Sequence, residues 1–357
     1  MSLPEPARSP DAGALFRAEI YEQPAALRRL LAHDREFARV AAAAREAGPL
    51  VRFVGHGSSD NAATYGVYAF GLLAGWTALR DSITLAVYYD AAFDLRGSVV
   101  LGLSQSGQTP DVVSYLERAR ERGAFTVAIT NDMESEMAQA AEAVLPLEAG
   151  PEHAVAATKT YVNQIAALAL LAAHVGGRGA EVAGAIADAA DQLEGALPAF
   201  EQQTRELANP FAYVGRMFVI GRGPEYATAR EIALKLLETC RTAAAPLTAT
   251  DLAHGPVAVL DPLFPVWAIA SHDVTLSAVQ DAVARVRQFG STIVASGTAA
   301  DELADADFRL RVPPPALPLL SPLLSVVPGQ LFAAALARAK GFDPDSPRGL
   351  TKVTLAR

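Results

Sequence analysis

Short apolar segments that end in glycine or a polar residue alternate along this chain with longer helical patterns. That alternation is typical of βαβ units, in which helices join parallel strands and cover both faces of one sheet. Five such segments in the first half are enough for a flavodoxin-like, doubly wound layer. The strands expected there cover residues 51–55, 83–88, 99–104, 125–130 and 143–147.

The second half of the chain repeats this arrangement. Gly221 lies 166 residues after Gly55, and Ser271 lies 167 residues after Ser104, each at the end of a corresponding strand. A nearly constant offset at two positions indicates duplication of one fold. We therefore predict an α/β protein of two tandem doubly wound domains, each with a five-stranded parallel sheet flanked by helices. The second set of strands is expected at 217–221, 265–271, 292–296 and 308–312, with a weaker candidate at 243–248.

The chain divides into four predicted parts. Its 357 residues exceed a typical domain of about 100–200 residues, and alanine-rich helical sequence between Gly176 and Pro210 separates the halves. We expect an N-terminal extension over residues 1–35, a first domain over 36–195, a second over 196–342 and a tail over 343–357. The prolines and glycine of the tail disfavour regular structure, so we expect it to lie across a surface or a site.

The charge and the cysteine content exclude several functions. A formal net charge of −9 gives no basic surface for nucleic acid or an anionic membrane. The apolar segment 165–175 is too short to cross a bilayer, and prolines interrupt 313–328. The single cysteine, Cys240, permits no intrachain disulfide, which favours a reducing cytoplasm. In so acidic a protein, an anionic ligand must be held by local dipoles.

The sharpest local signal is residues 101–111, where a strand leads into a polar loop that contains glycine. Thr109 suits the N-cap of the next helix, and Pro110 its first position. Free backbone N–H groups and the positive end of the helix dipole then point to one place beyond the strand, where the hydroxyls of Ser104 and Ser106 add donors. No lysine follows the glycine, so the loop suits a single phosphate monoester rather than a triphosphate; a well-capped turn without a ligand explains it equally well.

A second polar turn, residues 55–61, follows the first strand. It lacks the third glycine of a dinucleotide-binding fingerprint. Because ligands gather beyond the carboxyl ends of strands in open sheets, Ser58 and Ser59 can complete the same pocket. A tight, capped turn accounts for the glycines equally well.

Three charged residues, Glu231, Lys235 and Glu238, share one stripe of a predicted helix. A solvated Glu–Lys pair is the usual explanation, whereas the functional one is a carboxylate that moves a proton between neighbouring sugar carbons.

His254 lies in an irregular loop, where it can transfer protons near neutral pH or simply bond a backbone carbonyl. The histidines show neither H-x-H nor H-E-x-x-H spacing, so we expect no metal and no cofactor.

Together these segments resemble the sugar isomerase (SIS) family, in particular the tandem isomerase half of glucosamine-6-phosphate synthase and stand-alone glucosamine-6-phosphate deaminases. The resemblance covers nearly the whole chain. It implies that a phosphorylated sugar, or amino sugar, is the ligand. The residues that it implies for the phosphate are Ser59, Ser104, Gln105, Ser106 and Thr109, and those that it implies beside the sugar are Val155 and Ala157.

The same resemblance implies the catalytic roles. Glu238 would move the proton between C1 and C2, with Lys235 assisting and Glu231 close by. His254 would open the sugar ring, reaching into the neighbouring subunit's site of a homodimer. Lys352 would lie in a tail that closes the pocket and, in the synthase, contacts the open-chain sugar through an imine.

Two departures from the synthase shape the expected reaction. The sequence begins directly with the isomerase part, and both Ala157 and residues 246–251 differ from the serine and the acidic loop of the synthase. We therefore expect conversion of glucosamine 6-phosphate into fructose 6-phosphate and ammonia. The alternatives are a fructosamine-6-phosphate deglycase, the isomerase subunit of an amino-sugar phosphate synthase, and a non-catalytic sugar-phosphate-binding regulator.

Overall fold

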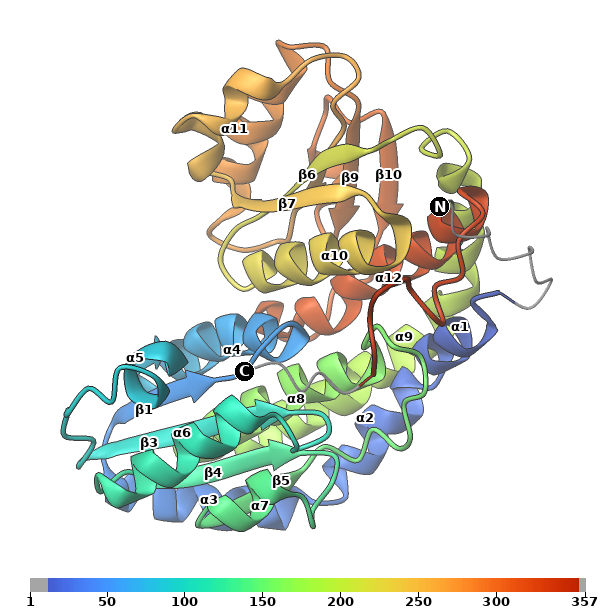
Figure 1. Cartoon of the computed structure of the whole chain (residues 1–357). Helices are drawn as coiled ribbons and strands as arrows, with labels where there is room; N and C mark the ends of the chain where they lie inside the picture. The colour runs from blue at the N-terminus through green and yellow to red at the C-terminus, as the bar shows by residue number, and fades with distance from the viewer. Residues whose placement is uncertain (1–11, 353–357) are drawn as a thin grey trace.

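The strands form two separate parallel sheets in the computed structural model, which describes residues 12–352. The first sheet is ordered β2-β1-β3-β4-β5 and the second β10-β9-β8-β6-β7, which is the same order when each half is numbered by itself (Figure 1). Two tandem, doubly wound, flavodoxin-like domains are thereby confirmed. The strands are β1 Leu50–Val54, β2 Thr77–Arg80, β3 Ser98–Ser104, β4 Phe125–Thr130, β5 Ala143–Pro146, β6 Arg216–Gly221, β7 Ala243–Thr248, β8 Val266–Ile269, β9 Ile293–Gly297 and β10 Phe308–Arg311.

Helices cover both faces of each sheet (Figure 1). Short π or 3₁₀ turns occur at Phe70–Ala74, Asp251–Ala253, Pro256–Val259, Ala300–Glu302 and Pro318–Leu320. The helices associated with the first sheet are α1 Ala14–Tyr21, α2 Gln23–Leu31, α3 Asp34–Ala47, α4 Ser58–Ala69, α5 Ile83–Val87, α6 Pro110–Glu121, α7 Glu136–Ala140 and α8 Lys159–Val175. Those that follow are α9 Gly179–Ala208, α10 Glu225–Cys240, α11 Leu276–Arg287 and α12 Pro322–Ala339.

The strand predicted at 83–88 is wrong, because this segment forms helix α5 and the strand lies earlier, at β2. Within α5 the buried residues are Ile83 and Ala86, three apart, which is the helical period. Strand β2 is mostly exposed because it lies at the sheet edge, so it carries no apolar run for a sequence pattern to detect. The weaker candidate at 243–248 is confirmed as β7.

The halves meet through helices. Helices α4 and α8 of the first half lie against α10 and α12 of the second (Figure 1). Arg230 of α10 also pairs with Asp60 of α4 at 2.8 Å. The helical segment 318–339 is long and apolar enough to cross a membrane by length and composition alone. However, 89% of its apolar 18-residue window is buried inside the protein. This segment therefore packs as a core helix.

Near the two ends of the described chain, helix α1 and the tail contact each other. Helix α9 runs without interruption from residue 179 to 208, so the predicted division at residue 195 falls inside it. Asp345 of the tail binds the start of α1: its carboxylate accepts the N–H groups of Leu15 at 3.2 Å and Phe16 at 2.7 Å. The terminal residues 1–11 and 353–357, which belong to the predicted extension and tail, lie outside the described residues.

Candidate active site

The polar loop after β3 lies where the strand order reverses in the first sheet. β3 is buried along its whole length and pairs with both β1 and β4. Gly107, with φ of +63°, folds the loop back so that its N–H bonds the Ser104 hydroxyl at 3.1 Å. A Cβ at Gly107 would lie 2.0 Å from Ser135 Oγ, so no other residue fits. The loop is a rigid turn at the position where open α/β sheets bind ligands.

The loop presents free donors to one place. No acceptor within residues 12–352 is recorded for the backbone N–H groups of Ser106, Thr109 and Asp111. Thr109 and Pro110 take the N-cap and first position of α6, as the sequence predicts, but the Thr109 hydroxyl bonds Ser104 Oγ at 3.1 Å rather than capping the helix. Unpaired N–H groups at a helix N-terminus suit an anion.

The turn after β1 adjoins this loop. A Cβ at Gly55 would meet Ser59 Cβ at 3.0 Å and the Leu103 carbonyl at 3.1 Å, which places the two segments side by side. Ser59 Oγ accepts a hydrogen bond from Gln164 at 2.9 Å, so its own proton stays available to a ligand. Gln105 and Ser106 are half-buried, and Ser104 is buried. All five residues expected at the phosphate thus lie at one edge of the first sheet.

The charged stripe of α10 is buried rather than solvated. Lys235 Nζ lies 2.6 Å from Glu238 Oε2 and 3.2 Å from Glu231 Oε1. The side chains of Glu231 and Lys235 are fully buried, whereas that of Glu238 is 22% exposed. The usual explanation, a solvated ion pair, therefore does not apply here.

Residues of the first domain complete this cluster. Ser58 donates to Glu231 Oε1 at 2.9 Å, and Asn61 donates to Glu231 Oε2 at 2.8 Å. Burial raises the pKa of Glu231, although Lys235 and Asn61 act against the rise. Burial alone would lower the pKa of Lys235, but Glu231 and Glu238 raise it above its ordinary value, so the lysine stays an ammonium ion. Of these three side chains, only that of Glu238 reaches the surface.

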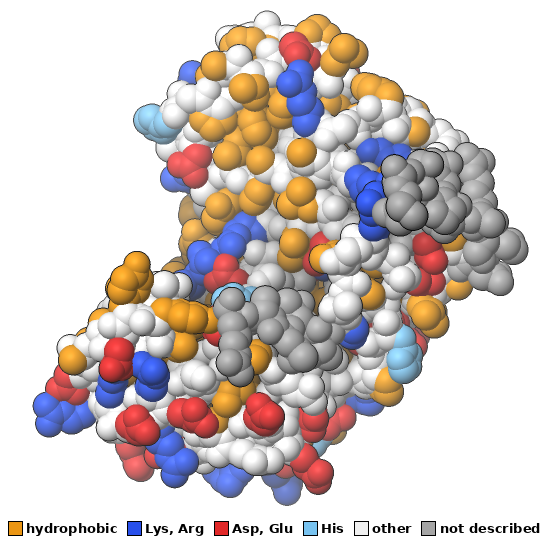
Figure 2. Space-filling model, viewed as in Figure 1, with side chains coloured by type: hydrophobic (Ala, Val, Ile, Leu, Met, Phe, Trp, Pro, Cys, Tyr) orange, Lys and Arg blue, Asp and Glu red, His pale blue; other side chains and the backbone are white. Residues whose placement is uncertain are grey.

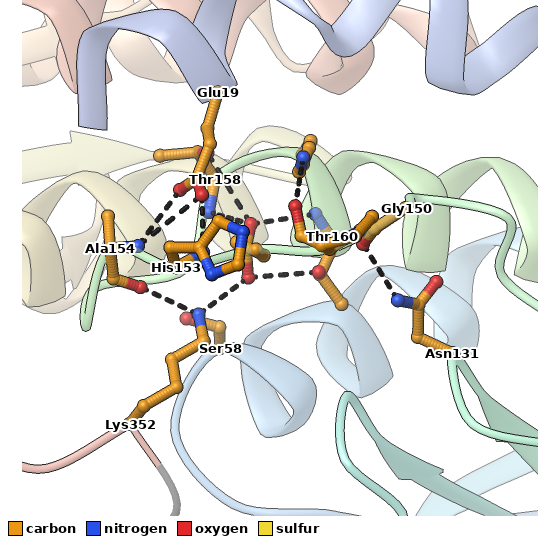
Figure 3. Close-up of polar contacts among 12 residues, drawn as sticks. Glu19, Ser58, Asn131, Gly150, His153, Ala154, Thr158, Thr160 and Lys352 are labelled. Carbon is orange, nitrogen blue, oxygen red and sulfur yellow. Dashed lines mark hydrogen bonds and ion pairs between the residues drawn. The ribbon is translucent and has the colours of Figure 1, made fainter. Parts of the chain in front are cut away.

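Residues 150–158, which we call the sugar loop, join β5 to α8. Val155 and Ala157 are partly exposed, and Ala154 and Ala156 between them are buried, so alternate residues face outward. Glu19 of helix α1 fixes the backbone by accepting the N–H groups of His153 and, at 3.3 Å, Ala154 (Figure 3). Burial raises the pKa of Glu19.

The tail brings Lys352 to the sugar loop. Its Nζ lies 2.9 Å from Glu152 Oε2 and 2.7 Å from the Ala154 carbonyl (Figure 3). The Glu152 side chain is fully buried, whereas the Lys352 side chain is 23% exposed. Figure 2 shows a hollow between the two halves of the molecule, with basic side chains gathered in it.

His254 lies apart from the other predicted residues. Glu238 lies near the end of α10, just before β7 begins, and therefore at the amino-terminal edge of the second sheet. His254 follows the carboxyl end of β7. Six strand residues rise roughly 3.3 Å each, so the two side chains lie at opposite edges of the second sheet. His254 is exposed, and no side-chain contact is recorded for it among residues 12–352. One chain alone does not bring it to Glu238.

In the second half, the loop between β8 and α11 corresponds to the loop after β3, and one of its own carboxylates accepts hydrogen bonds there. There the Asp273 carboxylate accepts both the N–H of Thr275, at 2.7 Å, and its hydroxyl, at 2.6 Å, directly before α11. A carboxylate at that helix N-terminus occupies the position that a ligand anion would take. In the first domain, by contrast, no carboxylate among residues 12–352 is recorded as the acceptor for the N–H groups of Ser106 and Thr109.

Sequence reasoning missed the roles of Glu152, Glu19 and Asn61. Glu152 lies 200 residues from Lys352, and Glu19 lies 134 residues from His153, so no local spacing signals either contact. Asn61 follows the turn that the sequence does single out, but nothing local indicates its bond to Glu231. In the described part of the chain, no cluster of three or more His, Cys, Asp or Glu side chains is arranged to hold a metal ion.

Comparison with known sequences gives the relationships of this chain. The SIS domain profile matches residues 50–174 and 211–339. The glutamine–fructose-6-phosphate aminotransferase (isomerizing) of Methanothermobacter thermautotrophicus is 36% identical over 344 residues, covering 94% of this chain and 56% of the relative. The Thermococcus kodakarensis protein of the same name is 35% identical with the same coverage. The chain thus spans about half the length of the curated relatives it matches.

Solved structures share the whole architecture. A candidate phosphosugar isomerase from Silicibacter pomeroyi superposes with a TM-score of 0.85 at 32% identity, covering 92% of this chain and 99% of that one. The C-terminal domain of glucosamine-fructose-6-phosphate aminotransferase from Francisella tularensis gives 0.83 at 23% identity, covering 96% and 99%. The second likeness is one of fold.

Proposed function

We propose that this chain, which belongs to the SIS domain family of phosphosugar isomerases, converts glucosamine 6-phosphate into fructose 6-phosphate and ammonia. The observation that carries the proposal is the cluster on α10, in which two buried residues orient the single accessible carboxylate, Glu238. The isomerase relatives at 36% identity support a ligand of this class.

Glu238 performs the proton transfer in this mechanism. After ring opening, its carboxylate removes the proton from C2 of the amino aldose and returns it to C1, which leaves an imine at C2. Water adds to that imine and ammonia leaves, so one water is consumed for each ammonia released. Lys235, held as an ammonium ion between two carboxylates, fixes the Glu238 carboxylate through the 2.6 Å hydrogen bond.

The phosphate is held by the loop after β3 and the turn after β1. Support comes from three backbone N–H groups without a recorded acceptor among residues 12–352, from the Ser59 hydroxyl proton, and from the dipole of α6, which favours negative charge. Val155 and Ala157 then border the sugar, between the phosphate and Lys352. These contacts account for binding of an anionic sugar by an acidic protein.

Ring opening is assigned to His254 of a partner subunit. Because one chain keeps His254 and Glu238 at opposite edges of the second sheet, a site that uses both requires a homodimer. An exposed histidine for which no side-chain contact is recorded among residues 12–352 is suited to that role.

The direct test is ammonia release. Pure protein incubated with glucosamine 6-phosphate should give equal amounts of ammonia and fructose 6-phosphate, and the reverse reaction should consume added ammonia. No product at micromolar enzyme, together with turnover of another phosphosugar, would remove the proposal.

A fructosamine-6-phosphate deglycase is the second candidate. It requires the same phosphate loop and the same proton transfer, and Ala157 leaves the sugar loop without the hydroxyl that the synthase carries. Comparing the kcat/KM for glucosamine 6-phosphate with that for fructoselysine 6-phosphate separates the two reactions.

One substitution distinguishes the proposed enzyme from a non-catalytic regulator that only binds a sugar phosphate. Glu238→Gln should lower kcat by about 10²- to 10⁴-fold while fructose 6-phosphate still binds. If turnover survives the substitution, the role of Glu238 is wrong and the binding function alone remains.

A further inference from the structure

The two oxygens of the Glu152 carboxylate accept different hydrogen bonds. Oε1 accepts the backbone N–H groups of Thr158 at 2.9 Å and Thr160 at 3.2 Å, at the start of α8. Oε2 accepts the Thr160 hydroxyl at 2.9 Å and Lys352 Nζ at 2.9 Å. Among residues 12–352, Oε1 thus binds only the start of α8 and the residue before it, whereas Oε2 is shared between α8 and the tail.

We propose that Glu152 is the positioning residue that holds Lys352, and with it the end of the tail, over the sugar site. The inference rests on the proposed function, which places a phosphosugar between the sugar loop and the loop after β3. Glu152 acts through Lys352 and takes no part in the proton transfer at Glu238.

The charge of Lys352 compensates for the burial of the Glu152 carboxylate. A carboxylate as deeply buried as Glu152 is costly unless it is paired. Burial alone would raise its pKa, but the charge of Lys352 and the N–H groups of Thr158 and Thr160 hold the pKa below its ordinary value. Glu152 therefore stays ionised at neutral pH, and losing Lys352 would leave a buried charge without its cation.

The tail is fastened to the sugar loop at two points. The Asp345 carbonyl accepts the Val155 N–H at 3.3 Å, and Lys352 binds Glu152 and the Ala154 carbonyl. Between these points lie Pro347 and Gly349, which break regular structure. Releasing Lys352 thus frees the end of the tail while Asp345 keeps its base in place.

Glu152→Gln tests whether the Glu152 carboxylate holds Lys352. Its amide oxygen can replace Oε1 toward Thr158 and Thr160, whereas its NH₂ group replaces Oε2 and meets the Lys352 ammonium as a second donor. We expect kcat/KM to fall about 10- to 100-fold, since a charge-assisted hydrogen bond is lost. The Leu350 N–H, which donates to the Pro347 carbonyl at 3.3 Å, should exchange hydrogen about tenfold faster or more.

A double-mutant cycle separates positioning from a merely structural role. If Glu152 acts through Lys352, then adding Glu152→Gln to Lys352→Gln should change kcat/KM by less than about twofold. If the two losses multiply, Glu152 acts independently of the lysine and the proposal is wrong. Glu121→Gln, at the exposed far end of α6, is the matched control and should leave both measurements unchanged.

Lys352→Gln also guards against misfolding of the Glu152 variant. It leaves the bonds from Glu152 to Thr158 and Thr160 in place, so it should speed amide exchange in the tail as much as Glu152→Gln does; exchange at the wild-type rate would overturn the proposal. The exchange measurement needs no substrate. A wild-type protein without activity on glucosamine 6-phosphate would therefore refute the proposed reaction, while tail exchange would still decide the role of Glu152.

Discussion

Four glutamates among residues 12–352, at positions 19, 152, 225 and 231, are buried, and their partners give them different properties. Glu152 faces Lys352 and has a lowered pKa, whereas burial raises the pKa of Glu231 and Glu225. Glu225 receives hydrogen bonds from the hydroxyls of Ser271 at 2.6 Å and Ser325 at 2.9 Å, but no ion pair is recorded for it among residues 12–352. Residue type alone therefore does not determine the charge of a buried carboxyl.

Glu225 predicts a specific dependence of stability on pH. Because its pKa is raised in the folded state, the stability it contributes is present in full below the unfolded pKa and is lost as the pH rises through the folded pKa. Relative to Glu225→Gln, the wild type should lose about 1.4 kcal/mol between pH 3.5 and pH 8 for each unit by which folding raises the pKa. Urea unfolding of both proteins at the two pH values measures this; an unchanged difference contradicts the assignment.

Gly107 predicts a second effect at the residue scale. Gly107→Ala forces a Cβ into Ser135 at a positive φ, so it should distort the loop, weaken fructose 6-phosphate binding by about tenfold or more and destabilise the fold by about 1–3 kcal/mol. Calorimetric binding and urea unfolding check both effects. The control is Gly184→Ala in α9, where nothing lies within 4 Å and a gain of about 0.5–1 kcal/mol is expected. Unaltered binding by Gly107→Ala would show that the loop is not the phosphate site.

At the scale of elements, helix α10 joins the two domains. Its first turn is tied through Glu225 to Ser271, at the carboxyl edge of the second sheet. Its later turns carry Glu231 and Lys235 to the carboxyl edge of the first sheet, where Ser58 bonds both of them, and Lys235 in turn binds Glu238. The catalytic carboxylate proposed for the reaction thus belongs to one domain, and the anion-binding loop to the other.

Helix α1 and the tail form a second connection, which Asp345→Ala should weaken. The substitution removes the acceptor for the N–H groups that begin α1, at a cost of about 0.5–2 kcal/mol. Because Glu19 of α1 fixes the sugar loop, amides of both α1 and residues 153–154 should exchange faster. Hydrogen exchange measures the change, with Asp188→Ala on the exposed face of α9 as control. Faster exchange confined to α1 would show that Glu19 does not transmit the effect.

At the scale of the whole molecule, the positions of His254 and Glu238 predict complementation. His254→Asn and Glu238→Gln should each be inactive, but mixing them under conditions of subunit exchange should restore about a quarter of wild-type activity, because half of the dimers then hold one intact site. Activity of the mixture, with each variant alone as control, gives the result. Failure to recover activity, despite exchange shown by differently tagged subunits, would place both groups in one chain.

The sequence by itself determined the elements that local pattern controls. Apolar periodicity predicts nine of the ten strands and the repeat, and turn chemistry predicts the loop from Ser104 to Pro110, because both depend on residues a few positions apart. Only the tertiary structure decided that the Glu231–Lys235 pair is buried, that Glu152 meets Lys352, and that His254 stands far from Glu238 in its own chain. These facts depend on which surfaces pack together across 100 residues or more, and the edge strand β2 escaped prediction because an exposed strand needs no apolar pattern.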